Sequence, residues 1–310
     1  MKPLVIIIAG PTATGKTALA VELAQNLNGE VISADSMQIY QQMSIGSAKP
    51  STEEMQGITH HMMDFVSPFS PYTVAQYKEE AEHCIDEILS RKKQPIVAGG
   101  TGLYVHSLIY NVDFSQAQAD KECRKELENI LFTQGNEKLY EMLLQADPVT
   151  AQRLHINDTK RVMRALEIFQ QTGQAMSEQE NNWQQPNEKY RFCLIGLTLE
   201  RSILYERINA RVDRMFEQGL AEEVENLKKQ GLNSKHQSMQ GIGYKEILDA
   251  LEGQYSLDEA KEKIKQGSRR YAKRQMTWFK KEQGINWLDI TNKNTDDITK
   301  EAQEIINLLR

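Results

Sequence analysis

The chain has 310 residues, of which 40% are hydrophobic and 26% charged, and its formal net charge is −6. This composition is typical of a globular protein large enough for one α/β domain or for a domain with an insertion. No apolar stretch reaches the ~18 residues of a membrane span, and the acidic balance argues against a nucleic-acid surface over the whole protein. Cys84, Cys123 and Cys193 are far apart, and no signal peptide precedes the first strand. We therefore expect a cytoplasmic protein with free thiols and no membrane segment.

A phosphate-binding loop is predicted near the start of the chain. Residues 4–9 predict a buried strand and residues 18–27 a helix, and between them the chain reads GPTATGKT. Glycines allow backbone N–H groups to point at phosphate oxygens, and the helix N-terminus adds its positive dipole end. The Lys16 ammonium can reach the outer phosphate oxygens, and the Thr17 hydroxyl can bind Mg²⁺. A tight turn without a ligand is the alternative. The predicted loop consists of Gly10, Pro11, Thr12, Ala13, Thr14, Gly15, Lys16 and Thr17.

The second strand is expected at residues 31–34, and Asp35 follows it directly. An aspartate at the carboxyl end of a strand beside a phosphate loop faces the ligand cleft of a parallel sheet. It can help to hold Mg²⁺ through water, or accept a proton from an incoming nucleophile. Capping of the next segment is the alternative function.

Further strands are expected at residues 95–98 and 192–199, with a helix over residues 73–89 between them and weaker strands at 62–66 and 285–290. Strands that alternate with helices predict an α/β fold of the phosphate-loop type, with a mainly parallel sheet and helices on both faces.

The strand at residues 95–98 ends in Ala98 and Gly99, where a standard NTPase has an aspartate that orders Mg²⁺ for hydrolysis. We therefore expect the phosphate loop to bind a diphosphate that leaves, rather than a γ-phosphate that is transferred.

The alternation stops in the middle of the chain. Residues 113–191 predict an all-helical insertion, so that residues 1–112 and 192–310 form the α/β core with C-terminal helices. Helix starts are expected at Asp120, Asp147 and Asp158, and helix ends at Gly135 and Gly173.

Basic side chains gather on three predicted helices. Arg207 and Arg211 are four residues apart, and either can clamp a diphosphate, although ordinary helix salt bridges are an equal alternative. Lys160, Arg161 and Arg164 begin a helix of the insertion, and residues 263–281 hold eight basic residues and no acidic one. Each stripe alone is explained by a solvated helix face. Together, beside a phosphate cleft, they favour contact with a polynucleotide.

The chain resembles the tRNA dimethylallyltransferase family in its short bacterial form. The matching motifs follow in order over nearly the whole chain: residues 10–17, 35–40, 45–50, 60–64, 99–104, 157–158 with 161–167, 241–244 and 273–279.

This resemblance implies transfer of a dimethylallyl group from dimethylallyl diphosphate to the exocyclic amine of the adenosine 3′-adjacent to the anticodon. It implies that Asp35 accepts the amine proton, that Thr101 positions the amine, and that the loop with Lys16 holds the diphosphate with Mg²⁺. The metal would be held by Thr17 and Asp35, and Arg211 is preferred to Arg207 as the diphosphate clamp.

A monomer that binds the tRNA anticodon stem-loop is expected. The tRNA-binding residues implied by the resemblance are Asp35, Ser36, Met37, Gln38, Thr101, Arg124, Lys160, Arg161, Val162, Met163, Arg164, Gly241, Gly243, Tyr244, Lys273, Arg274, Gln275, Thr277 and Trp278.

Two other functions explain part of the sequence. A kinase of a nucleoside or another small metabolite would use the same phosphate loop, but it leaves the helical insertion and the basic helices unexplained. An RNA-binding nucleotide switch without covalent chemistry is the second alternative.

Overall fold

A computed structural model describes residues 2–112, 121–179 and 185–309. The chain divides into two compact units, the first formed by Met1–Ile109 with Lys189–Arg310 and the second by Tyr110–Glu188. The insertion boundary expected at residue 113 and the helix start expected at Asp120 lie outside the described residues. Within those residues, no helix combines the length and apolar character needed to cross a membrane.

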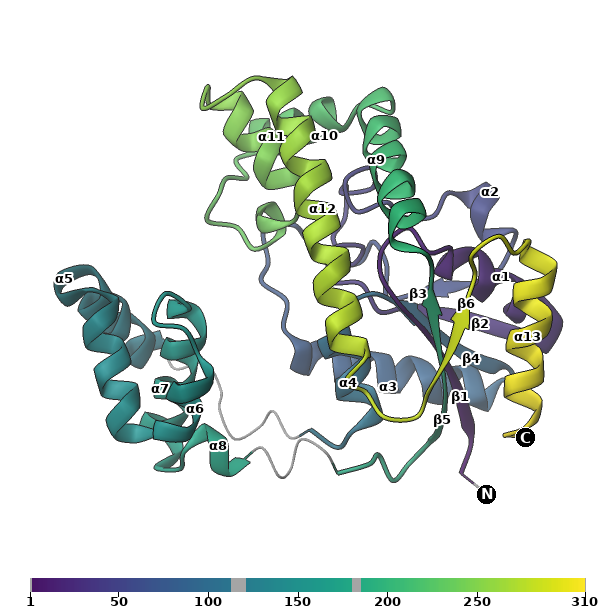
Figure 1. Ribbon diagram of the computed structural model, residues 1–310, viewed down its shortest axis with the longest axis horizontal. Coiled ribbons are helices and arrows are strands. Elements are labelled where there is room, and N and C mark those ends of the chain that lie inside the picture. The colour runs from purple at the N-terminus through teal and green to yellow at the C-terminus, as the bar shows by residue number, and fades with distance from the viewer. Residues whose placement is uncertain (1, 113–120, 180–184, 310) are drawn as a thin grey trace. The chain divides into compact units, whose positions relative to one another are not determined.

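The first unit is built on a parallel sheet of six strands in the order β3-β2-β4-β1-β5-β6 (Figure 1). Every pairing between these described strands is parallel, which confirms the predicted α/β class. The strands are β1 (Leu4–Ala9), β2 (Gly29–Ser33), β3 (His60–His61), β4 (Gln94–Gly99), β5 (Arg191–Thr198) and β6 (Ile285–Asp289).

Both faces of the sheet are buried. Successive side chains of each strand point to opposite sides, and helices cover each side. In β1, Ile6 and Ile8 belong to one apolar cluster, together with residues of α1 (Lys16–Leu27) and α13 (Thr295–Asn307). Val5 and Ile7 belong to the other, which includes residues of α3 (Val74–Ser90) and α4 (Gly102–Ile109).

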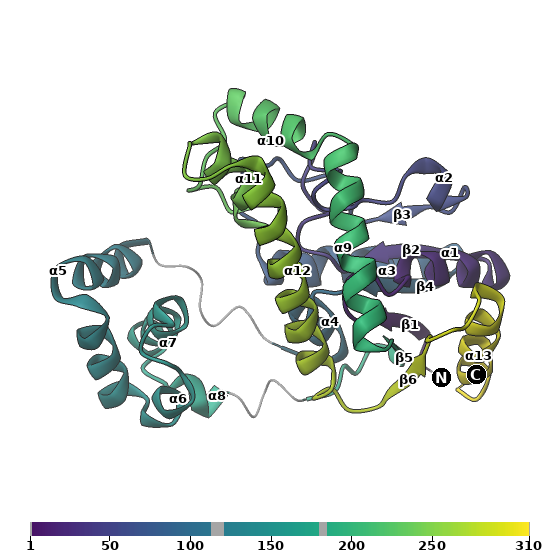
Figure 2. The same ribbon diagram turned by 45° about the horizontal axis from the view of Figure 1, so that its top comes forward.

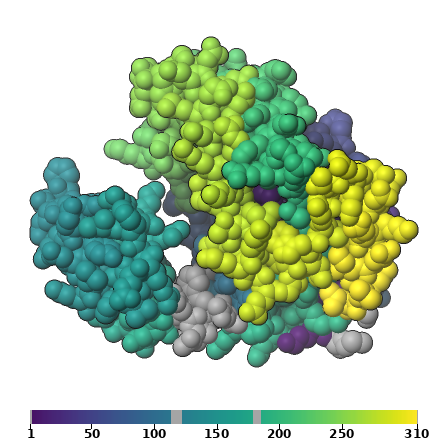
Figure 3. Space-filling model, in the orientation of Figure 1, coloured from purple at the N-terminus to yellow at the C-terminus, as the bar shows by residue number. Residues whose placement is uncertain are grey.

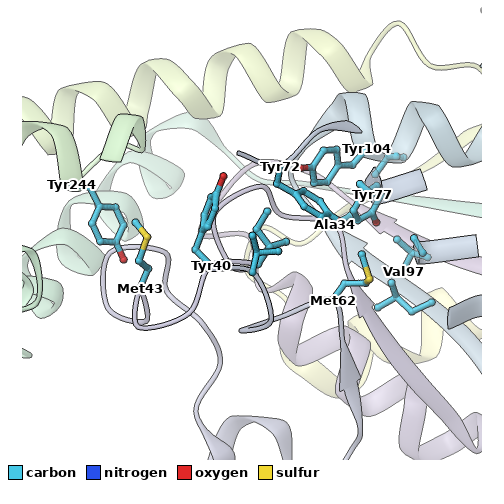
Figure 4. Close-up of a cluster of buried hydrophobic side chains, with 14 of the residues drawn as sticks. Ala34, Tyr40, Met43, Met62, Tyr72, Tyr77, Val97, Tyr104 and Tyr244 are labelled. Carbon is cyan, nitrogen blue, oxygen red and sulfur yellow. The ribbon is translucent and has the colours of Figure 1, made fainter. Parts of the chain in front are cut away.

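The second cluster contains a stacked aromatic pair. The rings of Tyr77 in α3 and Tyr104 in α4 are 3.9 Å apart and nearly parallel (Figure 4). This contact ties α4, which follows the loop after β4, to the helix that covers β2 and β4.

The remaining helices described in the first unit are α2 (Thr52–Met55), α9 (Arg201–Glu217), α10 (Leu220–Lys229), α11 (Tyr244–Leu251), α12 (Leu257–Phe279) and a short 3₁₀ helix, η3 (Ser238–Gln240). The helix α12 begins at a capping box, in which Ser256 and Glu259 exchange hydrogen bonds between side chain and backbone. It packs beside α9 (Figures 1 and 2), so two helices that are distant in sequence meet next to the sheet.

The described part of the second unit is helical, with α5 (Lys121–Ala146), α6 (Pro148–Arg153), α7 (Thr159–Thr172) and α8 (Met176–Gln179). Asp147 caps α6 and Asp158 caps α7, each by accepting a backbone N–H three residues later. Gly135 has a left-handed φ of 83° inside α5, and this interrupts the helix where the sequence predicts an end. Apolar side chains of α5, α6 and α7 form the core of the unit.

One charged cluster joins the strands β2 and β3 at the edge of the sheet. The buried Glu30 carboxylate contacts His61 at 2.6 Å, Arg91 at 2.7 Å and Lys93 at 2.8 Å. Burial opposes ionisation of this carboxyl, but the hydrogen bonds from Lys93, Arg91 and His61 lower the pKa of Glu30 to about 2. The ionised carboxylate therefore stabilises the fold.

Glu30→Gln is expected to lower the free energy of unfolding by about 1–3 kcal/mol near pH 7, because it removes the negative charge that Arg91, Lys93 and the His61 imidazole contact. The pKa of Glu30 is lowered in the folded state, so its contribution is present above pH ~5 and is lost as the pH falls toward 2. Urea denaturation from pH 7 to pH 3 should show the wild-type and Glu30→Gln curves converging. The exposed Glu79→Gln on α3 is the control, and a pH-independent difference would contradict this explanation.

Candidate functional site

Three loops meet at the carboxyl edge of the sheet. The register places Ala9 of β1 opposite Gly99 of β4, and Ser33 of β2 opposite Ala98. The loops that follow these strands, together with α9 and α12, line a cleft of about 1230 Å³. Its lining includes Thr12, Lys16, Thr17, Asp35, Gln38, Gly99, Gly100, Arg207, Arg211, Arg214, Tyr271 and Gln275.

The phosphate loop has the conformation that its glycines allow. Gly15 is in the left-handed region with a φ of 78° and stands at the start of α1, where no side chain caps the helix. Lys16 Nζ donates a hydrogen bond to Pro11 O at 2.6 Å, and the Thr14 hydroxyl donates to the same carbonyl at 2.8 Å. The lysine is thus held across the loop. The N–H groups of the first turn of α1 have no partner within the helix and can donate to an anion.

Positive charge is concentrated at this loop. Burial, together with the nearby guanidinium of Arg211, lowers the pKa of Lys16 to about 7, and the carboxylate of Asp35 opposes this shift. Burial also lowers the pKa of Arg211, again against the effect of Asp35. An anion bound between the two cations would relieve their repulsion and favour the charged form of Lys16.

This charge arrangement predicts that diphosphate binding takes up a proton above pH 7. The bound anion raises the pKa of Lys16 above its value of about 7 in the free protein, so affinity should fall as the pH rises through that range. Calorimetry of inorganic diphosphate at pH 8, in buffers of different ionisation enthalpy, should show uptake approaching one proton. In Lys16→Met this uptake should disappear. Any protonation of diphosphate itself occurs with both proteins and cancels when the two are compared. Equal uptake by the variant would mean that Lys16 is already charged.

Arg211 contacts the phosphate loop directly. Its Nη1 donates to Thr12 Oγ1 at 3.1 Å, whereas Arg207 lines the same cleft with an exposed side chain. Arg214 also lines the cleft, and the sequence analysis did not single it out. Its spacing of three residues from Arg211 on one helix was the signal that could have found it.

Asp35 and Thr101 lie on two loops that are joined by hydrogen bonds. The Asp35 Oδ1 accepts N–H groups from Met37 at 2.8 Å and Gln38 at 3.4 Å, which is the capping function considered above. Thr101 Oγ1 accepts the Ser36 N–H at 3.0 Å. The carboxylate therefore closes its own turn while it lines the cleft with Lys16.

Tyr271 is a further cleft residue that the motifs did not indicate. It comes from α12, and burial together with the charge of Asp35 raises its pKa to about 12. The phenol is therefore a neutral hydrogen-bond donor near Asp35 at physiological pH.

A third unpredicted residue, Glu223 of α10, holds the loop at residues 44–46. Its carboxylate accepts three consecutive N–H groups, those of Ser44 at 2.9 Å, Ile45 at 2.8 Å and Gly46 at 3.1 Å. It also accepts the Tyr244 hydroxyl at 2.7 Å. This loop lines the cleft, and no local pattern around Glu223 indicates the contact.

The side chains implied in tRNA binding fall into exposed and buried groups in the first unit. Lys273, Arg274, Thr277 and Trp278 are exposed on α12, which lies at the surface in Figure 3. In contrast, Gln275 and Tyr244 are buried, and Tyr244 lies beside Met43 (Figure 4).

The loop residues implied in tRNA binding make contacts within the protein. The Gln38 amide accepts a hydrogen bond from the Ser33 hydroxyl and donates one to the carbonyl of Ala48. Met37 packs against Gly241, and Gly243 starts α11.

In the second unit, too, some of the residues implied in tRNA binding are exposed and others are buried. Lys160 and Arg161 are exposed, but Val162 and Met163 are buried in its apolar core. Arg124 and Arg164 both contact the buried Glu167, at 2.8 Å and 3.3 Å. Val162 and Met163 are buried because they lie on the apolar side of an amphipathic helix, and their assignment to tRNA stays a prediction.

Residues 38–282 match the protein family described as IPP transferase. The chain belongs to the IPP transferase family. The tRNA dimethylallyltransferase of Acetivibrio thermocellus is 50% identical to it over 304 residues, which are 98% of this chain and 96% of that protein. The tRNA dimethylallyltransferase of Bacillus mycoides is 48% identical over 289 residues, 93% of this chain and 90% of that protein.

Solved structures of IPP transferases share the fold. The full-length tRNA isopentenylpyrophosphate transferase from Bacillus halodurans aligns with a TM-score of 0.74 and 41% identity over 99% of both chains. A eukaryotic dimethylallyltransferase acting on tRNA aligns with a TM-score of 0.82 and 33% identity over 98% of this chain and 78% of its own. The predicted family resemblance is confirmed.

Proposed function

We propose that this IPP transferase transfers a dimethylallyl group from dimethylallyl diphosphate to the exocyclic amine of the adenosine 3′-adjacent to the anticodon in tRNA, releasing diphosphate. One observation supports the proposal most directly. In a chain of this family, the cleft brings Lys16 of the phosphate loop and Arg211 of α9 together with a carboxylate, Asp35, on a neighbouring loop.

The diphosphate is assigned to the loop at residues 10–17. The charge of the leaving diphosphate grows as the bond to the prenyl carbon breaks, and Lys16, Arg211 and the N–H groups at the start of α1 stabilise that charge. Because these groups are fixed before the reaction, no reorganisation is needed when the charge develops.

Magnesium fits the donors of this cleft. Mg²⁺ is usually bound by one or two carboxylates together with substrate phosphates and water, and Thr17 and Asp35 offer a hydroxyl and a carboxylate on the same lining. The described residues contain no group of three His, Cys, Asp or Glu side chains that could hold a metal ion. We therefore assign Thr17 and Asp35 as its protein ligands, directly or through water, and the ion would add charge neutralisation for the diphosphate.

The acceptor amine is assigned to the other side of the cleft. A bond forms between the adenine nitrogen and the prenyl carbon, the carbon–oxygen bond to diphosphate breaks, and Asp35 accepts the proton that the nitrogen loses. The amine is a weak nucleophile because its lone pair is delocalised into the ring, so removal of the proton helps. Thr101 would position the amine, and the base must leave its stack, at a cost of a few kcal/mol at most in a loop.

Two exposed basic surfaces are assigned to the tRNA. One is on α12, with Lys273, Arg274 and Trp278, and the other is at the start of α7, with Lys160 and Arg161. We take residues 113–191 as an insertion that contacts the anticodon stem-loop, and the enzyme as a cytoplasmic monomer. The buried Val162, Met163, Tyr244 and Gln275 would act by packing or positioning.

The direct test incubates the purified chain with dimethylallyl diphosphate, Mg²⁺ and unmodified tRNA, followed by mass analysis of the nucleosides. Prenylated adenosine and an equal amount of diphosphate are expected, without any need for ATP. Conversion of ATP to ADP together with phosphorylation of a metabolite would support the kinase instead. Binding of tRNA without any product would support the nucleotide switch.

The double substitution Arg161→Ala with Lys273→Ala is expected to weaken tRNA binding and to reduce the slope of log Kd against log salt by about two, since each phosphate contact contributes about one. Titration of an anticodon stem-loop at several salt concentrations measures both effects. Lys138→Ala with Lys300→Ala, exposed lysines in the same two units, is the control. The affinity for diphosphate should not change, and its loss would show that the tRNA surface is misplaced.

A further inference from the structure

We propose that Gln275 is a positioning residue of the transfer reaction, whose buried amide holds the phosphate loop and the glycine loop after β4 at a fixed separation. This inference rests on the proposed function for its substrate. It separates Gln275 from the neighbouring side chains of α12, which are exposed to solvent and assigned to tRNA.

The amide of Gln275 hydrogen-bonds two loops that are distant in sequence. Its Oε1 accepts the backbone N–H of Thr12 at 2.9 Å, and its Nε2 donates to the carbonyl of Gly100 at 2.8 Å. The residue is only 5% exposed, so neither bond can be replaced easily by solvent. The side chain therefore points to the two loops of the cleft, whereas Lys273 and Arg274 beside it are exposed to solvent.

The absence of a side chain at Gly100 leaves the space that the Gln275 amide occupies. A Cβ atom on Gly100 would lie 2.1 Å from Gln275 Nε2, which is closer than two such atoms can approach. The glycine and the glutamine are therefore complementary, and a side chain at position 100 would push the amide out of its bridging position.

The bridge connects both halves of the reaction centre. On the diphosphate side, Thr12 bonds through its N–H to Gln275 and through its hydroxyl to Arg211. The Thr12 N–H is thus occupied, so the diphosphate would use the N–H groups that follow it. On the acceptor side, Gly100 precedes Thr101, which bonds to the N–H of Ser36, next to Asp35. A shift of about 1 Å between such groups can reduce the rate about 10²-fold.

The first experiment compares Gln275→Ala with Gln266→Ala, an exposed glutamine on the same helix. The Kd for inorganic diphosphate with Mg²⁺ should rise about tenfold, and kcat/KM for dimethylallyl diphosphate should fall about 10–10²-fold. The Kd for the anticodon stem-loop should stay within about twofold, at temperatures where melting curves show both variants to be folded. A loss of stem-loop affinity with unchanged diphosphate binding would overturn the proposal, because it would place the action of Gln275 on the RNA.

The second experiment is a double-mutant cycle with Gly100→Ala, measured by binding of inorganic diphosphate alone. Gly100→Ala should weaken binding about tenfold in the wild type, but less than about threefold in Gln275→Ala, since the colliding amide is then absent. Equal effects in both backgrounds would overturn the bridge. Because this readout needs neither tRNA nor prenyl transfer, a failure of the proposed function would be seen separately, in the nucleoside analysis.

Discussion

Replacing Asp35 by alanine is expected to lower the rate of prenyl transfer by at least about 10², while binding of tRNA survives. The carboxylate is the group assigned to accept the amine proton, and loss of a general base typically costs about 10²–10⁴ in rate. Single-turnover measurements with saturating dimethylallyl diphosphate separate this step from substrate binding.

Asp35→Asn tests the role of Asp35 in proton transfer while it keeps the hydrogen bonds of the local fold. The Asp35 Oδ1 accepts two backbone N–H groups, and an asparagine oxygen can accept the same bonds. Asp35→Asn should therefore retain the melting temperature of the wild type and still lose the activity. If Asp35→Asn turned over at the wild-type rate, the carboxylate would be a capping group only, and the proposed base would have to be sought elsewhere in the cleft.

The substitution Lys16→Ala is expected to lower kcat/KM for dimethylallyl diphosphate by about 10²–10³, equivalent to ~2.7–4 kcal/mol of barrier. Lys16 is held across the phosphate loop by its hydrogen bond to the Pro11 carbonyl, and in the proposed function it stabilises the growing charge of the diphosphate. The loss should appear mainly in kcat, because the interaction strengthens as the leaving group departs.

Lys300→Ala, an exposed lysine of α13, controls for the loss of one positive charge from the protein. A second comparison uses the tRNA stem-loop, whose Kd should be the same for Lys16→Ala and the wild type. Normal kcat with a raised Kd for tRNA would assign Lys16 to the RNA rather than to the diphosphate.

The motifs that sequence analysis found are those in which chemistry needs consecutive residues. The phosphate loop, the aspartate after β2 and the glycine loop after β4 each follow a buried strand, and parallel strands end at one edge of a sheet. Their meeting in one cleft was therefore predictable from the order of strands and helices. Helix caps at Asp147, Asp158 and Ser256 were predictable for the same reason, because capping is a local interaction.

Other assignments needed contacts that the order of residues does not contain. Gln275 follows Lys273 and Arg274 and shares their motif, but it points into the protein, to Thr12 and Gly100. Glu223 has no motif around it, and it holds a loop that is 177 to 179 residues away in sequence. Tyr244 shares a predicted tRNA motif with Gly241 and Gly243, and its burial in the core, at 0% exposure, could not be predicted from that motif.

The sequence by itself determined the fold class, the phosphate loop and the carboxylate beside it, because strand burial, helix periodicity and loop chemistry depend on neighbours in the chain. Only the tertiary structure decided which side of α12 faces the cleft, which arginine touches Thr12, and which motif residues are buried. These properties depend on how helices from distant parts of the chain pack against the sheet, and packing is set by shape and burial over the whole unit rather than by any local pattern.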